Sequence, residues 1–277
     1  MDQNQLRVPD PYGRTHQMDQ QALAAIAARL EARGKHPFFI RVIDDYLDAL
    51  GLLGTEALLD LGCGTGVAAR VIARRTEGTR AITAIDISAH LIEMAQRLAT
   101  EEGLGARIQF LTGDAHGLGL PEGGFDVVVM HTLISHVADP LTVLAEGWRL
   151  LRPGGRLVIF DGDYASFTLA TDAPDGGAET DRILQGAVFS QLRVMRAMPR
   201  LLASEGFELR WAQAYVAADI GRADFWAPSL ASFRVLLPRT GAMSEAEANA
   251  FIDQLERASA ENCFFGASNF YTYIAQR

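Results

Sequence analysis

The sequence contains little cysteine and less positive than negative charge. Cys63 and Cys263 are its two cysteines, and they match neither metal-ligand spacing nor a disulfide framework, which favours a reducing, cytoplasmic compartment. Lys and Arg number 25 against 34 Asp and Glu, for a formal net charge of −9. Because nucleic-acid backbones are bound by clustered basic residues, this balance argues against a nucleic-acid partner.

Long hydrophobic runs are also absent. No stretch approaches the roughly 18 apolar residues that a membrane-spanning helix requires. The N-terminal stretch MDQNQLRVPDPYGRTHQ lacks the apolar centre of a signal peptide. We therefore expect no membrane association. Hydrophobic residues still make up 49% of the chain, which is ample for a sizeable core.

Short apolar runs alternate with helical patterns in the middle of the chain. Strands separated by helices of ordinary length predict βαβ units, and hence a parallel sheet with helices on both faces. The apolar runs are continuous, as expected of strands covered on both faces. The strand-like runs occupy 56–61, 81–86, 107–114, 125–131 and 156–161, and the helical patterns occupy 66–75, 88–103 and 139–151.

The regions before residue 56 and after Asp161 do not continue this alternation of strands and helices. Two helices are predicted ahead of the sheet, at 19–34 and 36–52. A turn is predicted at 153–155, and after Asp161 we expect an irregular or partly helical stretch over 162–195. The remaining predicted elements are a helix at 198–207, a strand at 207–216, a helical insertion within 217–266 that carries a capping box at Ser244 and Glu247, and a last strand at 269–276.

Three glycines follow the first predicted strand. In ALLDLGCGTGVAARVIA, Asp60 closes the strand, and Gly62, Gly64 and Gly66 alternate before the next helix. Glycines at the carboxyl end of a parallel strand permit positive φ and let a ligand approach the backbone, and the helix N-terminus supplies free N–H groups. The alternative is a tight turn that binds nothing. Val67 stands where a dinucleotide fingerprint has its third glycine, which disfavours a nicotinamide oxidoreductase.

Two further carboxylates end the next strands. Asp86 closes the second strand, where a carboxylate can accept both hydroxyls of a ribose, and no basic residue is present to bind a 2′-phosphate. Asp114 ends the third strand, where it could hold an adenine amino group. The carboxyl ends of parallel strands meet at one edge of the sheet, so the pattern predicts a nucleoside-containing ligand there.

Four segments together resemble the class I S-adenosylmethionine-dependent methyltransferases, in particular their UbiE/Coq5-like small-molecule branch. They are LLDLGCGTG, AIDIS, GDAHGLGLPEGGFDVVVMHTLISHV and LRPGGRLVIFD, within roughly residues 55–162. The resemblance implies S-adenosylmethionine as cofactor and S-adenosylhomocysteine as product. The cofactor-binding residues that it implies are Asp60, Gly62, Cys63, Gly64, Thr65, Gly66, Asp86, Ile87, Ser88, Gly113, Asp114, Ala115, His116, His131 and Thr132.

The resemblance and the element pattern together predict the fold class. We expect an α/β, Rossmann-like, seven-stranded and mostly parallel sheet with an antiparallel last strand. N-terminal helices and a helical C-terminal insertion complete it. The predicted parts are a helical cap at 1–54, a cofactor-binding core at 55–162, and the rest of the sheet with substrate-facing insertions at 163–277, within one compact unit.

Candidate catalytic residues follow the fourth and fifth strands. Methyl transfer needs a base only where the acceptor atom carries a proton, and His136 is the candidate, although it could instead cap or pack the following helix. Asp163 and Tyr164 are candidate substrate contacts. No metal is expected, because metal-dependent relatives place a carboxylate after the fourth strand, where this chain has His131.

Aromatic residues of the insertion suggest how the acceptor is enclosed. Phe225 and Trp226 would line an apolar pocket, and the alternatives are that the insertion packs on itself or forms a homodimer contact. By the resemblance, residues 9–12 and Met18 would fold over the cofactor. We expect a small, partly apolar methyl acceptor. The competing hypothesis is a non-catalytic S-adenosylmethionine-binding sensor or partner subunit.

Overall fold

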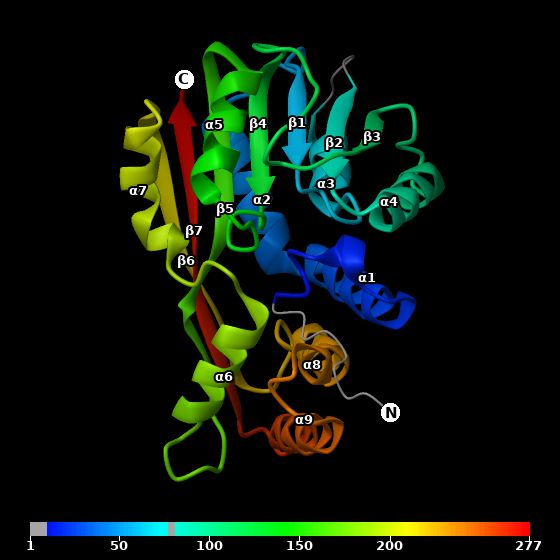
Figure 1. The fold of residues 1–277 in the computed structure, drawn as a ribbon, viewed down its shortest axis with the longest axis vertical. Coiled ribbons are helices and arrows are strands. Elements are labelled where there is room, and N and C mark those ends of the chain that lie inside the picture. Colours follow the sequence, from blue (N-terminus) through cyan, green and yellow to red (C-terminus); the bar gives the residue numbers. More distant parts are fainter. Residues whose placement is uncertain (1–9, 77–80) are drawn as a thin grey trace.

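A sheet of seven strands lies at the centre of residues 10–76 and 81–277, the part of the chain that the computed structural model describes (Figure 1). The strand order is β3-β2-β1-β4-β5-β7-β6. Strand β7 is antiparallel to both of its neighbours, whereas β1 to β5 run parallel. The predicted fold class is therefore confirmed. The strands are β1 (Leu58–Leu61), β2 (Ile82–Asp86), β3 (Ile108–Thr112), β4 (Phe125–His131), β5 (Leu151–Leu169), β6 (Glu208–Gly221) and β7 (Phe264–Gln276).

Helices cover both faces of the sheet. In β4, Val127 and Val129 pack with α2, α3 and α4, whereas Val128 and Met130 pack with α5 and α7. This two-sided burial explains why the strand reads as one continuous apolar run. The helices are η1 (Thr15–Gln17), α1 (Gln20–Lys35), α2 (Pro37–Leu50), α3 (Val67–Arg75), α4 (Ala89–Glu101), α5 (Pro140–Leu150), α6 (Ala178–Val188), α7 (Val194–Ser204), α8 (Ala227–Thr240) and α9 (Glu245–Ala260). Within the described ranges, no helix has the length and apolarity needed to cross a bilayer.

Local capping groups set several helix boundaries as the sequence predicts. The Ser88 side chain accepts a hydrogen bond from the Leu91 N–H at the start of α4. At α9, Ser244 and Glu247 form both hydrogen bonds of the predicted capping box. These bonds satisfy N–H groups that the first turn of a helix leaves free.

The prediction of an irregular stretch directly after Asp161 is wrong for residues 162–169. Strand β5 continues to Leu169, because this segment pairs with β7 through Gly162 opposite Phe270 and Leu169 opposite Gly266. Likewise, the turn predicted at 153–155 is an irregularity within β5, where its register against β4 shifts between Phe125 and Val127. Both differences come from pairing with strands that are distant in the sequence.

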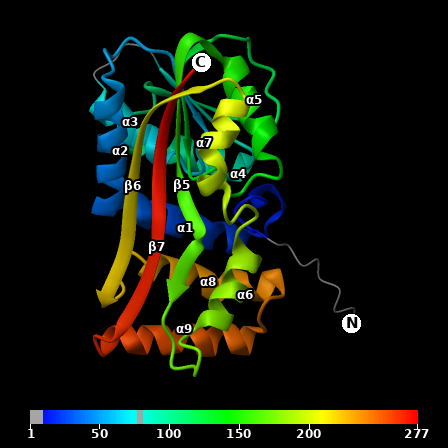
Figure 2. The ribbon, with the colours of Figure 1, turned by 90° about the vertical axis from the view of Figure 1, so that its left-hand side faces the viewer.

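The three long strands extend the sheet beyond its parallel part. Strands β5, β6 and β7 extend past β1 and β4, and α6, α8 and α9 lie along this extension (Figure 2). Helix α1 lies between the carboxyl ends of β1 and β4 on one side and α8 on the other (Figure 1). Ala22 and Ile26 of α1 pack on Leu236 of α8. The predicted insertion therefore contacts the N-terminal helix.

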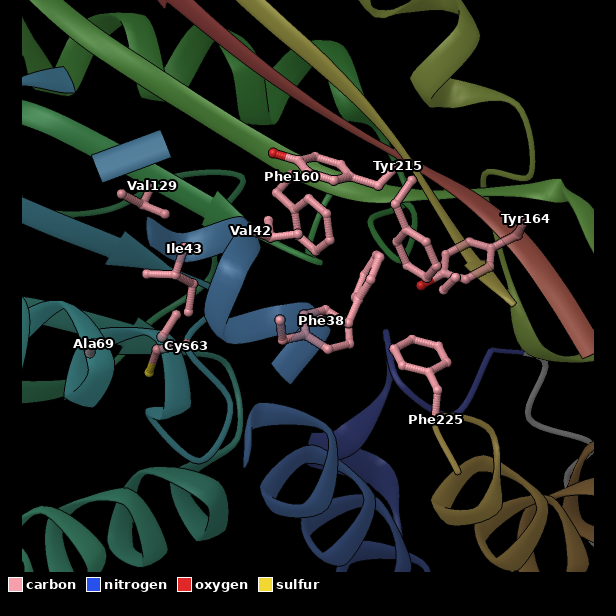
Figure 3. Packing of buried hydrophobic residues seen from close by; sticks show 14 of the residues in the cluster. Phe38, Val42, Ile43, Cys63, Ala69, Val129, Phe160, Tyr164, Tyr215 and Phe225 are labelled. Atoms are coloured by element: carbon pink, nitrogen blue, oxygen red, sulfur yellow. The ribbon is translucent and has the colours of Figure 1, made fainter. Parts of the chain in front are cut away.

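An aromatic cluster fills the space between α2 and the long strands. Phe39 of α2 stacks on Phe225, with ring centroids 5.6 Å apart, and Phe160 of β5 stacks on Phe270 of β7 at 5.6 Å. Phe38 contacts the edge of Phe225 at 5.2 Å. Figure 3 shows Phe38, Phe160 and Phe225 of this cluster beside α2. The cluster holds α2 against the sheet.

Candidate functional site

A cavity of about 380 Å³ lies at the carboxyl ends of the parallel strands. Its walls come from the loops that follow β1, β2, β3 and β4. Helix α1 and the N-terminal segment from Tyr12 to Gln17 supply further wall residues. Ligands of open parallel sheets bind at this edge, where the strand order reverses between β1 and β4. The cavity therefore occupies the position that the sequence predicts for the ligand.

The glycine-rich loop turns sharply around one wall of this cavity. Gly62, Gly64 and Gly66 have φ values of 76°, 56° and 76°, a region that other residues rarely adopt. The N–H of Gly62 donates to the Ile85 carbonyl at 2.8 Å, which ties the loop to β2. A Cβ on Gly64 would meet only Leu30 within 4 Å, at 3.0 Å. The backbone at Gly64 thus faces open space rather than packed protein.

Asp60 ends β1 as a buried carboxylate with a free acceptor. Its Oδ2 accepts a hydrogen bond from the Ala69 N–H at 3.1 Å, and its Oδ1 is buried without a partner in the described part of the chain. Burial raises the pKa of Asp60 to about 7. An unpaired buried acceptor is costly in the absence of a donor. Since Asp60 lines the cavity, a cationic or N–H-bearing ligand group fits beside it.

Asp86 is held in a fixed orientation at the end of β2. Its Oδ2 accepts the Gly64 N–H at 2.8 Å, and its Oδ1 accepts the Ser88 N–H at 2.9 Å. Burial raises the pKa of this carboxyl as well. Each oxygen retains acceptor capacity toward the cavity. This geometry suits a pair of ligand hydroxyls.

The loops after β3 and β4 complete the wall. Asp114 pairs with His116, whose Nδ1 lies 2.7 Å from its Oδ1, and both side chains are partly exposed. The half-buried ring of His131 contacts Phe39 and Phe160, and desolvation followed by repulsion from Arg33 lowers the pKa of His131 to about 3, so its ring is neutral. Thr132 has a φ of 58°, which is rare for a β-branched residue. Such strained positions cluster at functional sites.

His136 faces the cavity from the loop after β4 and is paired with Asp10. Its Nδ1 lies 2.8 Å from Asp10 Oδ1. Asp10 also accepts the N–H groups of Gly13 and Ser190, so its position is fixed from two sides. With Nδ1–H directed at the carboxylate, Nε2 of His136 is the nitrogen left to accept a proton. A carboxylate paired with a histidine in this way can orient a general base.

Comparison with known proteins identifies the part of the chain that builds most of these walls. The sequence model of a family described as a methyltransferase domain matches residues 59–159. This range contains the glycine-rich loop, Asp60, Asp86 and His136. Residues 59–159 therefore form a methyltransferase domain. S-adenosylmethionine is the cofactor of such domains.

Relatives with known sequences share this domain rather than their whole length. An uncharacterised 37.1 kDa transposon protein of Streptomyces fradiae is 36% identical over 168 residues, covering 58% of this chain and 46% of that protein. The ubiquinone/menaquinone biosynthesis C-methyltransferase UbiE of Dinoroseobacter shibae is 34% identical over 119 residues, covering 43% of this chain and 47% of that one. The chain thus spans about half the length of these relatives.

A solved structure shares the fold over nearly the full length. The [4+2]-cyclase SpnF is 20% identical, with a TM-score of 0.63 and coverage of 98% of each chain. At this identity the likeness shows the fold alone. The overall fold of the chain is therefore found in a solved protein.

The cavity beside the methyltransferase domain's glycine-rich loop has the features that S-adenosylmethionine requires. The free Oδ1 of Asp60 matches the need of the cofactor's ammonium group for an acceptor, and Asp86 matches its ribose hydroxyls. The open face of Gly64 allows close approach to the backbone. Of the residues predicted to bind the cofactor, those lining the cavity are Asp60, Gly62, Cys63, Gly64, Thr65, Asp86, Ile87, Gly113, Asp114, Ala115, His116, His131 and Thr132.

Two of the predicted cofactor residues lie behind the wall rather than on it. Gly66 is the N-cap residue of α3, and a Cβ there would lie 2.7 Å from the Phe110 ring. Ser88 is buried, caps α4 and donates its N–H to Asp86. Both therefore support residues that line the cavity.

The four predicted substrate residues other than His136 lie outside the cavity wall. Asp163 is buried and accepts hydrogen bonds from Arg196, at 2.8 and 2.9 Å. Tyr164 stacks on Phe189, and its hydroxyl is buried without a partner among the described residues. Phe225 and Trp226 belong to the aromatic cluster.

Two further predictions concern a metal site and the N-terminal cover. In residues 10–76 and 81–277, no group of three or more His, Cys, Asp or Glu side chains could hold a metal ion. Of the predicted N-terminal cover, Tyr12 lines the cavity, and Pro9 lies outside the described residues.

The sequence does not reveal the roles of three residues at the site. Asp10 pairs with the cavity residue His136, and nothing in the sequence connects the two. Arg29 and Arg33 of α1 also face the cavity. The sequence pattern does predict their direction, because they follow Ile26 at helical spacing and so lie on the face of the helix that points inward.

Proposed function

We propose that this protein is an S-adenosylmethionine-dependent methyltransferase acting on a small, partly apolar molecule. One observation carries the proposal: a single cavity is lined by the glycine-rich loop with Asp60 and Asp86 and also by His136, which is paired with Asp10. A site that only stored the cofactor would not need an oriented histidine. The apolar part of the wall, formed by Ile26, Leu30 and Phe39 among others, suits a partly apolar acceptor.

The protein's own contribution is alignment, water exclusion and proton removal. The bound cofactor would supply an activated methyl group as a sulfonium. The fixed carboxylates of Asp60 and Asp86 would hold its two ends, so that the acceptor atom approaches in line. His136 Nε2 would take the proton of an acceptor hydroxyl or amine, and Asp10 would stabilise the imidazolium that forms. Tyr12 and α1 would exclude water on the acceptor side.

The relatives support a small-molecule acceptor. UbiE of Dinoroseobacter shibae, which is 34% identical over 119 residues, is named for ubiquinone and menaquinone biosynthesis. The net charge of −9 also disfavours a nucleic-acid substrate. A cytoplasmic location and a homodimer belong to the same proposal as predictions from the sequence.

Two measurements, made one after the other, test this function. Calorimetry with S-adenosylhomocysteine should give saturable binding at one site per chain. The protein is then incubated with methyl-labelled S-adenosylmethionine and a small-molecule extract, and the labelled product is sought by mass spectrometry. Labelled product that disappears with His136→Ala supports the enzyme. Tight cofactor binding with no S-adenosylhomocysteine formed above background would favour the non-catalytic sensor.

A further inference from the structure

Helix α1 directs two buried arginines at the cavity without a carboxylate partner. Arg29 and Arg33 are one turn apart, line the cavity, and retain only 6% and 9% of their exposure. Within residues 10–76 and 81–277, neither guanidinium lies within ion-pair distance of an acidic side chain. Buried charges are normally paired, because removing them from water is costly. Two adjacent unpaired cations therefore call for an explanation.

Each arginine is held in place by neutral groups. Arg33 donates from Nη2 to Thr132 Oγ1 at 2.8 Å and lies over the Phe39 ring. Arg29 donates from Nε to Ser229 Oγ at 3.1 Å and lies over the Tyr12 ring. Burial, followed by repulsion from Arg29, lowers the pKa of Arg33 to about 10. The two side chains are thus oriented, yet their charge is not neutralised.

The nearby carboxylates are already committed elsewhere. Asp161 accepts hydrogen bonds from the N–H and hydroxyl of Ser135 and from the Gly162 N–H. Asp163 is paired with Arg196, and Asp10 with His136. No nitrogen atom of Arg29 or Arg33 is both completely buried and without a hydrogen-bond partner. Their remaining N–H groups therefore have access to the cavity, where a ligand could meet them.

We propose that the methyl acceptor carries a carboxylate or similar anionic group that binds to Arg29 and Arg33. This inference rests on the proposed function, since it assigns the substrate class of the same cavity. Two guanidiniums on one helix face offer the bidentate donors that planar oxyanions accept. An anion seated there would supply the charge that the two arginines lack.

The position of Arg29 assigns the anion to the acceptor rather than to the cofactor. Tyr12 lies between Arg29, 4.6 Å from its ring centroid, and His136, whose ring centroid is 5.3 Å away. Ser229, the partner of Arg29, belongs to α8 and not to the loops that follow the parallel strands. An acceptor whose reacting atom lies at His136 would therefore extend its far end along Tyr12 toward Arg29.

Binding of matched acids and amides tests the proposal. The protein is saturated with S-adenosylhomocysteine, so that the cofactor's own carboxylate is already bound. Acetate is then compared with acetamide, and benzoate with benzamide, by thermal unfolding at constant ionic strength and by calorimetry. We expect the acids to bind and raise the melting temperature, and the amides to do neither. Arg29→Met should weaken acid binding by roughly 10- to 100-fold, which is the loss of a charge-assisted hydrogen-bond pair.

Controls separate a binding role from a structural one. Arg97→Met makes the same change at an exposed arginine of α4 and should leave acid binding intact. Removing an unpaired buried charge should not lower the melting temperature of ligand-free Arg29→Met, whereas removing a structural contact would. The Arg29→Lys variant, which keeps the charge, should retain part of the affinity for the acids.

Three outcomes would overturn the proposal. Wild-type protein could treat each acid and its amide alike, by binding both or neither. Arg29→Met could lose stability while it keeps its preference for acids. Arg29→Met could instead bind S-adenosylhomocysteine more weakly than wild type does and bind decarboxylated S-adenosylmethionine equally well. That result would assign the anion to the cofactor. Failure of S-adenosylhomocysteine to bind wild type is a different result: it contradicts the proposed function, and the acid–amide comparison can still be made on the ligand-free protein.

Discussion

His136 Nδ1 and Asp10 Oδ1 lie 2.8 Å apart although 126 positions separate the two residues in the sequence. The contact joins the loop after β4 to the segment that precedes α1. Asp10 has a φ of 51°, and its N–H donates to the Ala187 carbonyl at the end of α6. Three parts of the chain therefore meet at one carboxylate. Orientation of the histidine depends on all of them.

His136→Ala should lower turnover by ~10²- to 10⁴-fold if the acceptor carries a proton, which is the usual contribution of a general base. Cofactor affinity should change little, because the residues that hold the cofactor are elsewhere on the wall. Initial rates of S-adenosylhomocysteine formation and calorimetric affinity provide the two measurements. Wild-type turnover in this variant would leave alignment as the protein's main contribution.

Asp10→Asn tests whether Asp10 acts by positioning His136. The amide keeps the size of the side chain but cannot stabilise an imidazolium, so we expect kcat to fall by roughly tenfold or more with little change in KM. In the His136→Ala background the same substitution should have no further effect on kcat. Asp126→Asn, at the amino end of β4 and away from the cavity, is the matched control. Additive losses in the double variant would contradict coupling.

Asp86→Ala should weaken S-adenosylmethionine binding by ~10- to 100-fold, because two ribose hydroxyls lose a charged acceptor. The structure adds a second cause, since Asp86 also holds the N–H of Gly64. Asp86→Asn, which keeps one acceptor oxygen, should show a smaller loss. Calorimetry on folded variants gives the answer. Unchanged affinity in Asp86→Ala would remove this residue from the cofactor site.

The sequence predicted the parts of the fold that depend on local pattern. The continuous apolar run of β4 and the capping box of α9 are local, and the structure contains both. The strand over residues 162–169 is not predicted from the sequence, because it forms by pairing with β7, about a hundred positions later. Non-local pairing leaves little trace in a single sequence.

The same distinction holds within the site. Asp60 and Asp86 are recognisable because each closes a strand of a parallel sheet, which places both at one edge. Asp10 is different, since its role exists only once the N-terminal segment crosses the loop after β4. Arg29 and Arg33 are intermediate: the inward stripe of α1 predicts where they point, but not that they remain unpaired.

Phe225→Ala should destabilise the fold by roughly 3–5 kcal/mol, as expected for a truncated buried aromatic residue. Phe225 stacks on Phe39 and contacts Phe38, and it does not line the cavity. If residues 217–266 instead closed the acceptor pocket through this side chain, acceptor use would weaken at unchanged melting temperature. Thermal unfolding together with acceptor and cofactor affinities distinguishes the two. Phe265→Ala, at an exposed position of β7, is the control.

The pH dependence of ligand-free stability should reveal the buried carboxyl of Asp60. Burial raises its pKa to about 7 in the folded protein, from an ordinary value of 3.8. The folded state therefore holds a proton that the unfolded state has released between about pH 4 and pH 7. The contribution of this group to the free energy of unfolding is therefore fully present below about pH 4 and is lost as the pH rises to about 7. Asp60→Asn should reduce that loss, although Asp86, raised in the same direction, leaves a residual slope.

Cofactor binding should couple to the same proton. The ammonium group of the cofactor beside Asp60 would favour the ionised carboxylate, so binding near pH 7 should release a proton and affinity should rise with pH through this range. Calorimetry in buffers of different ionisation enthalpy measures the protons released per ligand bound. In Asp60→Asn the release should fall while the protein stays folded, because the amide matches the carboxyl in size. Equal proton release in wild type and variant would show that Asp60 does not meet the ammonium group.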